Sequence, residues 1–408
     1  PLLLSSAVPM GVADLLRKSG LLYSERPAGL LRKGGRFSPK NADDTINQGG
    51  RPILKQFFKR FKPFNTKTNH GATSVCPVRD NKKAIVTFIA DDGIYHSCVK
   101  YNEFFRQYGL KGTAALITDW VEKHYAYGDS GSPPDGANGA YCGTWKEWRE
   151  LIDQGQMDIA NHSFNHRDFA GIDPAVEPDE LEKQINGARS TLLTKLKGIK
   201  VIGMVSPYNT KNAKAEAVIR QHHYAERSGV EGDNPLDPDD TAWYALNYRT
   251  ADSGKSAGVM NAWVDDAIAG GRWCIEMWHG VDGEGWYPPS GETCGRHLAY
   301  LAGRLNDVWN ATYNEAIQYI HERQNATVSV QNKAGRTDYT IKLTLPPEYK
   351  QFSYPLTLKT LLHEDWTGKA TVIQDGKTRH AEPVIEGDNK YLIYNAVPNK
   401  GDIKIRRE

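Results

Sequence analysis

The sequence has no long apolar run and little cysteine. None of its apolar stretches approaches the roughly eighteen residues that a helix needs to cross a bilayer, so no transmembrane segment is predicted. Cysteine occurs five times, at Cys76, Cys98, Cys142, Cys274 and Cys294, without a CxxC pair or zinc-ribbon spacing. A zinc ribbon is therefore excluded, whereas a single bridge such as Cys274 to Cys294 and isolated buried thiols both stay open.

Excess charge of either sign is also lacking. Lys and Arg total 51 against 49 Asp and Glu, which gives a formal net charge of +2. This balance produces no field that would attract nucleic acid or an anionic membrane, so neither is predicted as a partner. Hydrophobic residues at 39% and charged residues at 25% are close to the globular average, so a chain of 408 residues is expected to fold as one large domain and a smaller part.

Three parts are predicted along the chain. Residues 1–80 show no sustained helix-like or strand-like periodicity of apolar residues, and we expect them to form an N-terminal extension that wraps the core. The basic, aromatic stretch at 55–62 is interpreted as apolar anchors with snorkelling lysines, with a nucleic-acid or lipid role as the alternative. In residues 81–325, β-rich runs alternate with helical stretches, which is typical of a (β/α) barrel around a parallel sheet. The predicted strands are 84–90, 113–118, 157–161, 201–206, 243–248 and 273–278, and the predicted helices are 144–154, 180–197, 213–222, 259–269, 296–309 and 313–323.

The last part of the chain, residues 326–408, has a different sequence pattern. Short alternating runs at 327–330, 339–345, 370–373 and 390–394 are separated by turns rich in Gly, Pro, Asn and Asp. This pattern predicts a small all-β sandwich. Packing against the barrel and carbohydrate binding are its two possible roles.

Two adjacent carboxylates end the first strongly apolar strand. Asp91 and Asp92 follow 84–90 and precede Gly93. Neighbouring carboxylates repel, so both stay ionised only where a cation or donor compensates one of them. One carboxylate then binds a metal ion while the other handles protons. An ordinary Asp-Asp-Gly turn is the alternative interpretation.

Two histidines four residues apart follow the strand at 157–161. His162 and His166 share one face if the chain turns helically where the strand ends, which lets both imidazoles reach one ion. With Asp92 they would supply three ligands and leave a position for water, as in hydrolytic rather than structural zinc sites. The predicted cofactor is a divalent metal, with Zn favoured and Co, Ni or Mn as alternatives. Two exposed helix histidines are the competing interpretation.

A third strand, 273–278, ends at His279. A cationic imidazole at the barrel mouth can protonate a departing amine or alcohol, although a lone histidine at a strand end is usually just a hydrogen-bonded surface residue. Trp278, Trp286 and Tyr287 lie near His279 in the sequence. They are predicted to form an apolar pocket or a face on which sugar stacks, with core packing as the alternative.

Together these segments resemble the polysaccharide deacetylase family, also called carbohydrate esterase family four, over roughly residues 82–310. That family includes chitin and peptidoglycan deacetylases and acetylxylan esterases, and its resemblance implies a distorted (β/α) barrel. It implies that Asp91 is the general base and His279 the general acid. The implied metal ligands are Asp92, His162 and His166. The implied activity is metal-dependent removal of N-acetyl or O-acetyl groups, and the implied partner is an acetylated polysaccharide or oligosaccharide.

A further family motif, an Arg-x-Pro-Tyr-like sequence, is matched in part. Pro207 and Tyr208 fit it, and Tyr208 is expected to shape the substrate groove while its backbone donates to an oxyanion. Val205 stands where many members have the arginine that orients the base. Arg227, expected at the end of the next strand, is the candidate substitute, with a plain salt bridge as the alternative.

Two rival functions stay open on the sequence. One is hydrolysis of a small non-peptide amide, as in allantoinase-like relatives of the fold, because the orienting arginine is missing from its motif. The other is a non-catalytic glycan-binding protein whose C-terminal part supplies the affinity. Acetylated polysaccharides lie mostly in cell walls and extracellular matrices, so the resemblance also implies a secreted, periplasmic or cell-surface location.

Overall fold

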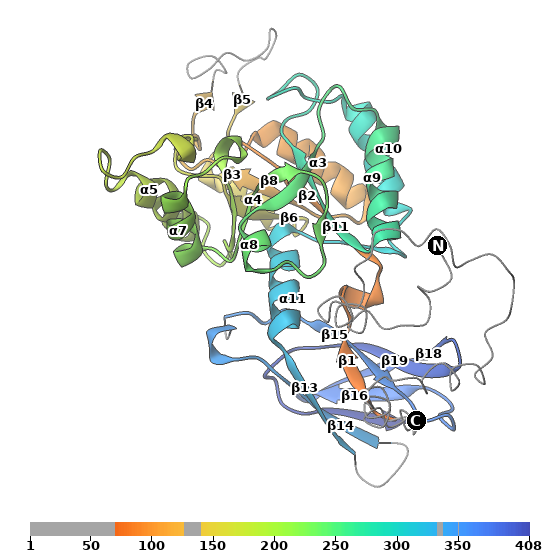
Figure 1. Ribbon diagram of the computed structural model, residues 1–408. Helices are drawn as coiled ribbons and strands as arrows, with labels where there is room; N and C mark the ends of the chain where they lie inside the picture. Colours follow the sequence, from red (N-terminus) through yellow and green to blue (C-terminus); the bar gives the residue numbers. More distant parts are fainter. Residues whose placement is uncertain (1–69, 126–139, 333–337, 350) are drawn as a thin grey trace, which may run out of the picture. The chain divides into compact units, whose positions relative to one another are not determined.

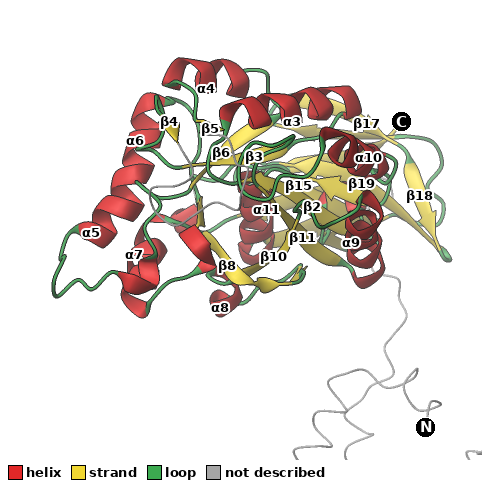
Figure 2. Cartoon of the chain, turned by 90° about the horizontal axis from the view of Figure 1, so that it is seen from above, coloured by secondary structure: helices red, strands yellow, loops and turns green. Residues whose placement is uncertain are grey.

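A computed structural model describes residues 70–125, 140–332, 338–349 and 351–408 (Figures 1 and 2). The stretch 55–62 and most of the expected N-terminal extension lie outside these residues. In the part of the chain that is described, no helix is both long enough and apolar enough to span a membrane.

Seven parallel strands close into the predicted barrel, one more than the six strands expected from the sequence, because Ala225–Glu231 was not among them. They pair in the order β2, β3, β6, β7, β8, β10 and β11, and β11 pairs again with β2 from Trp273 opposite Ile85 to Trp278 opposite Ala90. The strands are β2 (Ala84–Ala90), β3 (Gly112–Leu116), β6 (Met157–Asn161), β7 (Gly203–Val205), β8 (Ala225–Glu231), β10 (Leu246–Thr250) and β11 (Arg272–Trp278). Two short strands extend the sheet: β12 (Val308–Asn310) lies parallel to the first half of β2, and β9 (Asn234–Pro235) antiparallel to β11.

Strand β2 is buried along its whole length, which explains its continuous apolar sequence. Its side chains alternate between two hydrophobic clusters. Ile85 and Ile89 belong to the cluster that fills the barrel, whereas Val86 and Phe88 belong to the cluster between the strands and the helices. The first barrel strand is therefore covered on both faces.

Helices surround the barrel strands when the chain is seen from above (Figure 2). They are α3 (Tyr95–Tyr108), α4 (Trp145–Ile152), α5 (Glu180–Glu182), α6 (Ala188–Lys195), α7 (Ala213–His222), α8 (Asp240–Trp243), α9 (Ala257–Gly270), α10 (Gly291–Ala302) and α11 (Tyr313–Asn325). A π-helical turn, η4 (Lys183–Gly187), joins α5 to α6. Capping boxes fix the starts of α4 and α11, where Thr144 pairs with Glu147 and Thr312 with Glu315.

Several predicted elements differ from those in the structure. The predicted helix at 296–309 ends at Ala302 because the chain turns there to form β12. The predicted strand at 243–248 starts instead at Leu246, since α8 occupies the residues before it. Helix α3 was not predicted. Its buried face includes the polar residues Ser97 and Asn102, which interrupt the apolar pattern.

Two antiparallel sheets follow the barrel. One has the order β13-β14-β20-β16-β17 and the other β1-β15-β19-β18. Their bounds are β13 (Thr327–Asn332), β14 (Asp338–Thr344), β15 (Leu356–Leu361), β16 (Ala370–Gln374), β17 (Lys377–Ala381), β18 (Pro383–Glu386), β19 (Asn389–Ala396), β20 (Ile403–Arg407) and β1 (Thr73–Val75). Buried residues of both sheets, such as Ile341 and Leu358, belong to one hydrophobic cluster.

The segment before the barrel takes part in the second of these sheets. Strand β1 pairs antiparallel with β15, with Thr73 opposite Thr360. Further on, the Tyr319 hydroxyl on α11 donates to the Cys76 carbonyl at 2.8 Å. Residues just before the barrel are thus tied to elements more than two hundred residues away. The limits 1–80, 81–325 and 326–408 stay a prediction.

All five cysteines are buried and unbridged. Burial raises the pKa of the Cys76 thiol to about 11 and that of Cys142 to about 12. Thiols of this kind are protonated and inert at neutral pH. The structure therefore agrees with the interpretation of isolated buried thiols.

Candidate functional site

The residues singled out in the sequence lie at one end of the barrel. Asp91 and Asp92 follow β2, His162 follows β6, and His279 follows β11. Pro207 is buried in a short 3₁₀ turn after β7, η5 (Pro207–Asn209). Because all these strands run parallel, their carboxyl ends meet at a single mouth.

Three of these side chains converge at the mouth. The Asp92 Oδ1 atom lies 3.4 Å from His162 Nε2 and 3.6 Å from His166 Nε2. All three potential ligand atoms lie within 4.8 Å of one another. Across the described ranges, no other group of three His, Cys, Asp or Glu residues meets this criterion. The set of two imidazoles and one carboxylate is therefore suited to a divalent cation.

The orientation of His162 is fixed by the backbone of the next strand. Its Nδ1 atom lies 2.7 Å from the Val205 carbonyl oxygen, which can only accept a hydrogen bond. Nδ1 therefore carries a proton and donates it to this bond, and Nε2 faces Asp92. Such a second hydrogen bond is the usual way in which a metal-binding histidine is held.

The segment from His162 to His166 is not helical, and the expectation of a helical turn is wrong. Ser163 has a φ of 77° and His166 a φ of 64°, both in the left-handed region. The Ser163 hydroxyl accepts a hydrogen bond from the His166 backbone N–H at 2.9 Å. This local loop, rather than a helix face, brings the two imidazoles to 4.9 Å between ring centroids.

Other backbone positions at the mouth are strained in the same way. Asp92 has a φ of 70°, Tyr208 of 57° and Asn209 of 53°. Each left-handed non-glycine residue costs about 1–3 kcal/mol, and such positions are concentrated at functional sites. Gly93, with a φ of 66°, has no room for a side chain, since a Cβ there would lie 2.8 Å from Leu116 Cδ2. The Asp-Asp-Gly turn is thus built for one conformation.

The charges at the mouth are set by burial and by mutual attraction. Burial opposes ionisation of Asp92, but the hydrogen bond with His162 and the charge of His279 hold its pKa well below the usual range. Burial lowers the pKa of His166 to about 4, against the attraction of Asp92. Asp92 is therefore ionised and His166 neutral near pH 7. Both are the protonation states in which these groups bind a metal ion.

Asp91 is compensated by a buried cation. Arg227 Nη2 donates to Asp91 Oδ2 at 2.6 Å, and the two residues are 1% and 2% exposed. The guanidinium also lies over the Tyr248 ring, at 5.4 Å from its centroid. Within the described residues, Asp91 Oδ1 has no hydrogen-bond partner. One carboxylate oxygen is thus held by Arg227, while the other is free to accept a proton.

The aromatic residues around His279 divide into two groups. The Trp286 ring lies 5.1 Å from that of His279 and is 38% exposed. Trp278, in contrast, is fully buried and stacks on Phe88 with a centroid distance of 4.9 Å. The prediction that Trp278 contacts substrate is wrong, because its side chain points out of the barrel toward the helices and completes the hydrophobic core.

Tyr208 and one residue that was not predicted enclose His166. The Tyr208 ring is 55% exposed and lies 4.6 Å from the His166 ring. On another side, the Trp120 ring lies 5.5 Å from His166. Trp120 follows β3 after a short loop, and its position just beyond a predicted strand end is the signal that could have placed it at the mouth. The Val205 carbonyl left no such signal, because a backbone group is the same in every residue.

Part of the chain is similar to a known protein family. Residues 78–226 match the sequence profile of the family described as Polysaccharide deacetylase. No curated protein sequence matches the chain. Among solved structures, the chain is similar to a family 4 acetyl xylan esterase from Clostridium thermocellum in complex with a cobalt ion. The identity is 16% and the TM-score 0.38, with 57% of this chain and 89% of the esterase chain covered.

Two further solved structures are similar. One is the Streptococcus pyogenes deacetylase PplD in complex with acetate, at 18% identity and a TM-score of 0.29, covering 40% of this chain and 62% of that one. The other is BA3943, a CE4 family pseudoenzyme from Bacillus anthracis, at 14% identity and a TM-score of 0.37, covering 58% of this chain and 66% of that one. The match over residues 78–226 includes Asp91, Asp92, His162 and His166. Over this part of its length, the chain is similar to the polysaccharide deacetylase family.

Proposed function

We propose that this protein is a metal-dependent hydrolase that removes acetyl groups from a polysaccharide. The observation that supports this proposal most is the convergence of Asp92, His162 and His166 at the mouth of the barrel. Their donor set, their burial and the fixed tautomer of His162 fit a divalent cation, with zinc favoured. A cation held there would supply positive charge to the acetyl carbonyl oxygen and to the attacking water.

Asp91 is the proposed general base. Its free oxygen accepts a proton from the attacking water, while Arg227 holds the other oxygen in place. Arg227 thus performs the orienting role for which Val205 leaves no side chain in the Pro207-Tyr208 motif. The arginine comes from β8, the strand next to β7, so its guanidinium reaches the base by a different path.

His279 is the proposed general acid. After water attacks, the departing sugar nitrogen or oxygen needs a proton, which a cationic imidazole can give. The backbone N–H of Tyr208 is proposed to donate to the oxyanion. The exposed rings of Tyr208 and Trp286 are proposed to bind the sugar by stacking, since they flank His166 and His279.

Two other functions are possible for a barrel of this kind, and one experiment separates all three. Acetate release from chitin oligomers, peptidoglycan and acetylxylan is measured beside ring opening of a small cyclic amide. The proposal expects acetate release that disappears with Asp92→Ala. Ring opening without acetate release would favour the small-amide hydrolase. Glycan binding without any turnover, in metal-loaded protein, would favour a non-catalytic binder.

The substrate class also bears on location. Acetylated polysaccharides are mostly cell-wall or matrix polymers, so a deacetylase that acts on them works outside the cytoplasm. We propose a secreted, periplasmic or cell-surface location on this ground. Fractionation of the source cells with detection of the native chain tests it, and confinement to the cytosolic fraction would contradict it.

A further inference from the structure

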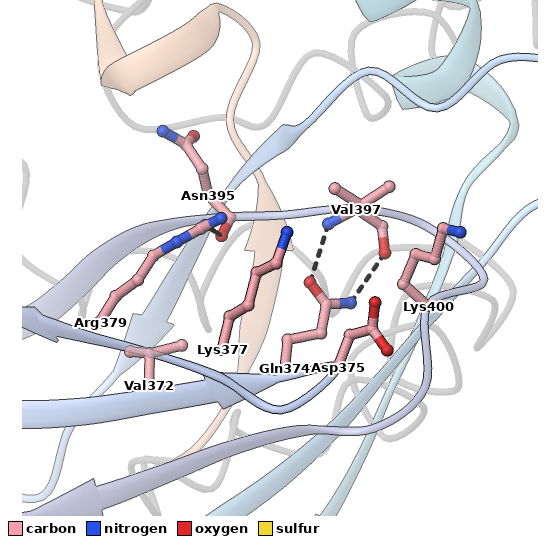
Figure 3. A pocket seen from close by; sticks show the side chains of 8 residues that line it. All are labelled: Val372, Gln374, Asp375, Lys377, Arg379, Asn395, Val397 and Lys400. Carbon is pink, nitrogen blue, oxygen red and sulfur yellow. Dashed lines mark hydrogen bonds between the residues drawn. The ribbon is translucent and has the colours of Figure 1, made fainter.

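A cationic groove lies between the two C-terminal sheets, away from the barrel mouth. Its main hollow, of about 200 Å³, is lined by Lys377, Arg379 and Lys400 together with the single carboxylate Asp375 (Figure 3). Three cations and one anion leave it a net charge of +2. The volume is that of several water molecules, which is enough for a small charged substituent.

Strand pairing places two of these cations on the inner side of the sheet. A two-residue Asp-Gly turn, with φ of 52° at Asp375 and 70° at Gly376, joins β16 to β17. The resulting register sets Arg379 opposite Val372, which is 3% exposed. Side chains directly opposite in a ladder share a face, and alternate residues along β17 do too. Lys377 and Arg379 therefore face the gap between the sheets.

Hydrogen bonds hold the opposite wall of the groove in place. The Gln374 side chain donates to the Val397 carbonyl at 2.8 Å and accepts from the Val397 N–H at 3.0 Å. Arg379 Nη1 donates to the Asn395 carbonyl at 2.7 Å. These bonds fix the loop after β19 that places Lys400 in the groove, as Figure 3 shows. The groove is therefore a built feature of both sheets.

The cations of the main hollow are not neutralised within the protein. No ion pair involves Lys377, Arg379 or Lys400 anywhere in the described portion of the chain. An adjoining hollow of about 300 Å³ shares Arg379 and adds Arg79 and His380, but these two are already paired. Arg79 lies 3.5 Å from Asp80, and His380 pairs with Glu408. The unbalanced positive charge is thus confined to the main hollow.

One structural explanation competes with ligand binding. Strand β17 is the edge of its sheet, and inward-pointing charges on an edge strand prevent pairing with another chain. That function needs only a charge on β17 itself. It does not account for Lys400, which lies on the loop between β19 and β20 and lines the same hollow. Cations that converge from an edge strand and from a separate loop are what an anion site requires.

We propose that the cationic groove binds an anionic polysaccharide through its acidic substituents, either carboxylates or sulfate esters. The guanidinium of Arg379 offers planar donors that match both groups. A neutral sugar would need an exposed aromatic face, and the aromatic residue of the groove, Tyr394, is only 6% exposed. That the anion belongs to a polysaccharide rests on the proposed function, because the same chain holds the deacetylase domain.

The test uses the full chain with Lys377→Gln and Lys400→Gln combined. A matched control combines Lys342→Gln with Lys404→Gln, which removes the same charge from exposed positions on the other face of the same sheet. Binding to polygalacturonate, dextran sulfate, neutral dextran and duplex DNA is measured by titration calorimetry at low and high salt. The two acidic polymers distinguish carboxylate from sulfate ester.

The proposal expects the wild-type chain to bind at least one acidic polysaccharide, with affinity that falls as salt increases. The groove variant should bind it at least about tenfold more weakly than wild type does. The affinity of the control should stay within about twofold of wild type. Equal losses of affinity in both variants would overturn the proposal. So would a wild-type chain that binds neither acidic polymer, or one that binds DNA as tightly as it binds them. Because none of the polymers carries an acetyl group, the result does not depend on whether the barrel is a deacetylase.

Discussion

Arg227 and Asp91, 136 residues apart in sequence, form a buried ion pair of 2.6 Å at the barrel mouth. The sequence alone does not show which cation compensates the two adjacent carboxylates after the buried strand, because Val205 stands where an arginine is expected. A carboxylate in such a place stays ionised only beside a cation. Strand β8 supplies that cation, so the proposed base is paired although Val205 offers it no charged side chain.

Replacing Arg227 by Gln is expected to lower kcat by about 100-fold, because Asp91 loses the group that orients it. The variant should still bind the metal ion, since Arg227 contacts none of the three proposed ligands. Because an unpaired buried charge costs about 3–5 kcal/mol, thermal unfolding is measured in parallel. Arg220→Gln on the surface of α7 is the control and should keep full activity. Wild-type kcat in a folded Arg227→Gln protein would contradict the role.

His279→Ala is expected to separate substrates by their leaving groups. Hydrolysis of an N-acetyl sugar needs a proton on the departing nitrogen and should fall by about 100-fold or more. Hydrolysis of p-nitrophenyl acetate needs no such proton and should change by less than about fivefold. The measurement is the ratio of kcat/KM values for the two substrates in both proteins. Equal losses on both substrates would argue against a general acid.

Two tryptophans close in sequence are expected to behave differently. Trp286→Ala, at an exposed ring beside His279, should raise KM for an acetylated oligosaccharide with little effect on thermal stability. Trp278→Ala should instead destabilise the fold by about 3–5 kcal/mol, because its ring fills the core against Phe88. Chemical denaturation and steady-state kinetics on both variants check this. A raised KM in a stable Trp278→Ala protein would restore Trp278 as a substrate residue.

Glu322 predicts a pH dependence of stability. This buried residue on α11 accepts from the Tyr354 N–H, and burial raises its pKa from an ordinary 4.5 to about 7. The folded state therefore holds the proton more tightly, and the stabilisation present below pH 4.5 is lost as pH rises through about 7. Compared with wild type, Glu322→Gln should gain about 2 kcal/mol of stability between about pH 5 and about pH 8. Urea unfolding at both pH values measures it, and a constant difference would refute it.

The barrel was predictable because several of its strands, β2 above all, are mostly apolar on both faces and are followed by polar side chains, although β8 and β10 are largely polar. Strands 84–90 and 157–161 have the bounds that the sequence predicts, and their ends carry Asp91, Asp92 and His162. What could not be predicted depends on contacts between distant residues. The bend at His166 requires positive φ values, and the burial of Trp278 requires the helices that cover it. The pairing of Arg227 with Asp91 was one of two open interpretations until the closed barrel joined β8 to the mouth.

The central claim is that Asp92, His162 and His166 bind one metal ion that is needed for acetate release. Its most direct test is metal content and activity measured on the same samples, after chelation and after zinc is added back. The account predicts about one zinc ion per wild-type chain, activity that is lost on chelation and returns with zinc, and neither property in Asp92→Ala or His162→Ala. His222→Ala, at a half-buried histidine of α7 that pairs with Glu182 outside the site, should match wild type in metal content and activity. Full acetate release from metal-free wild-type protein, or from His162→Ala, would contradict the account.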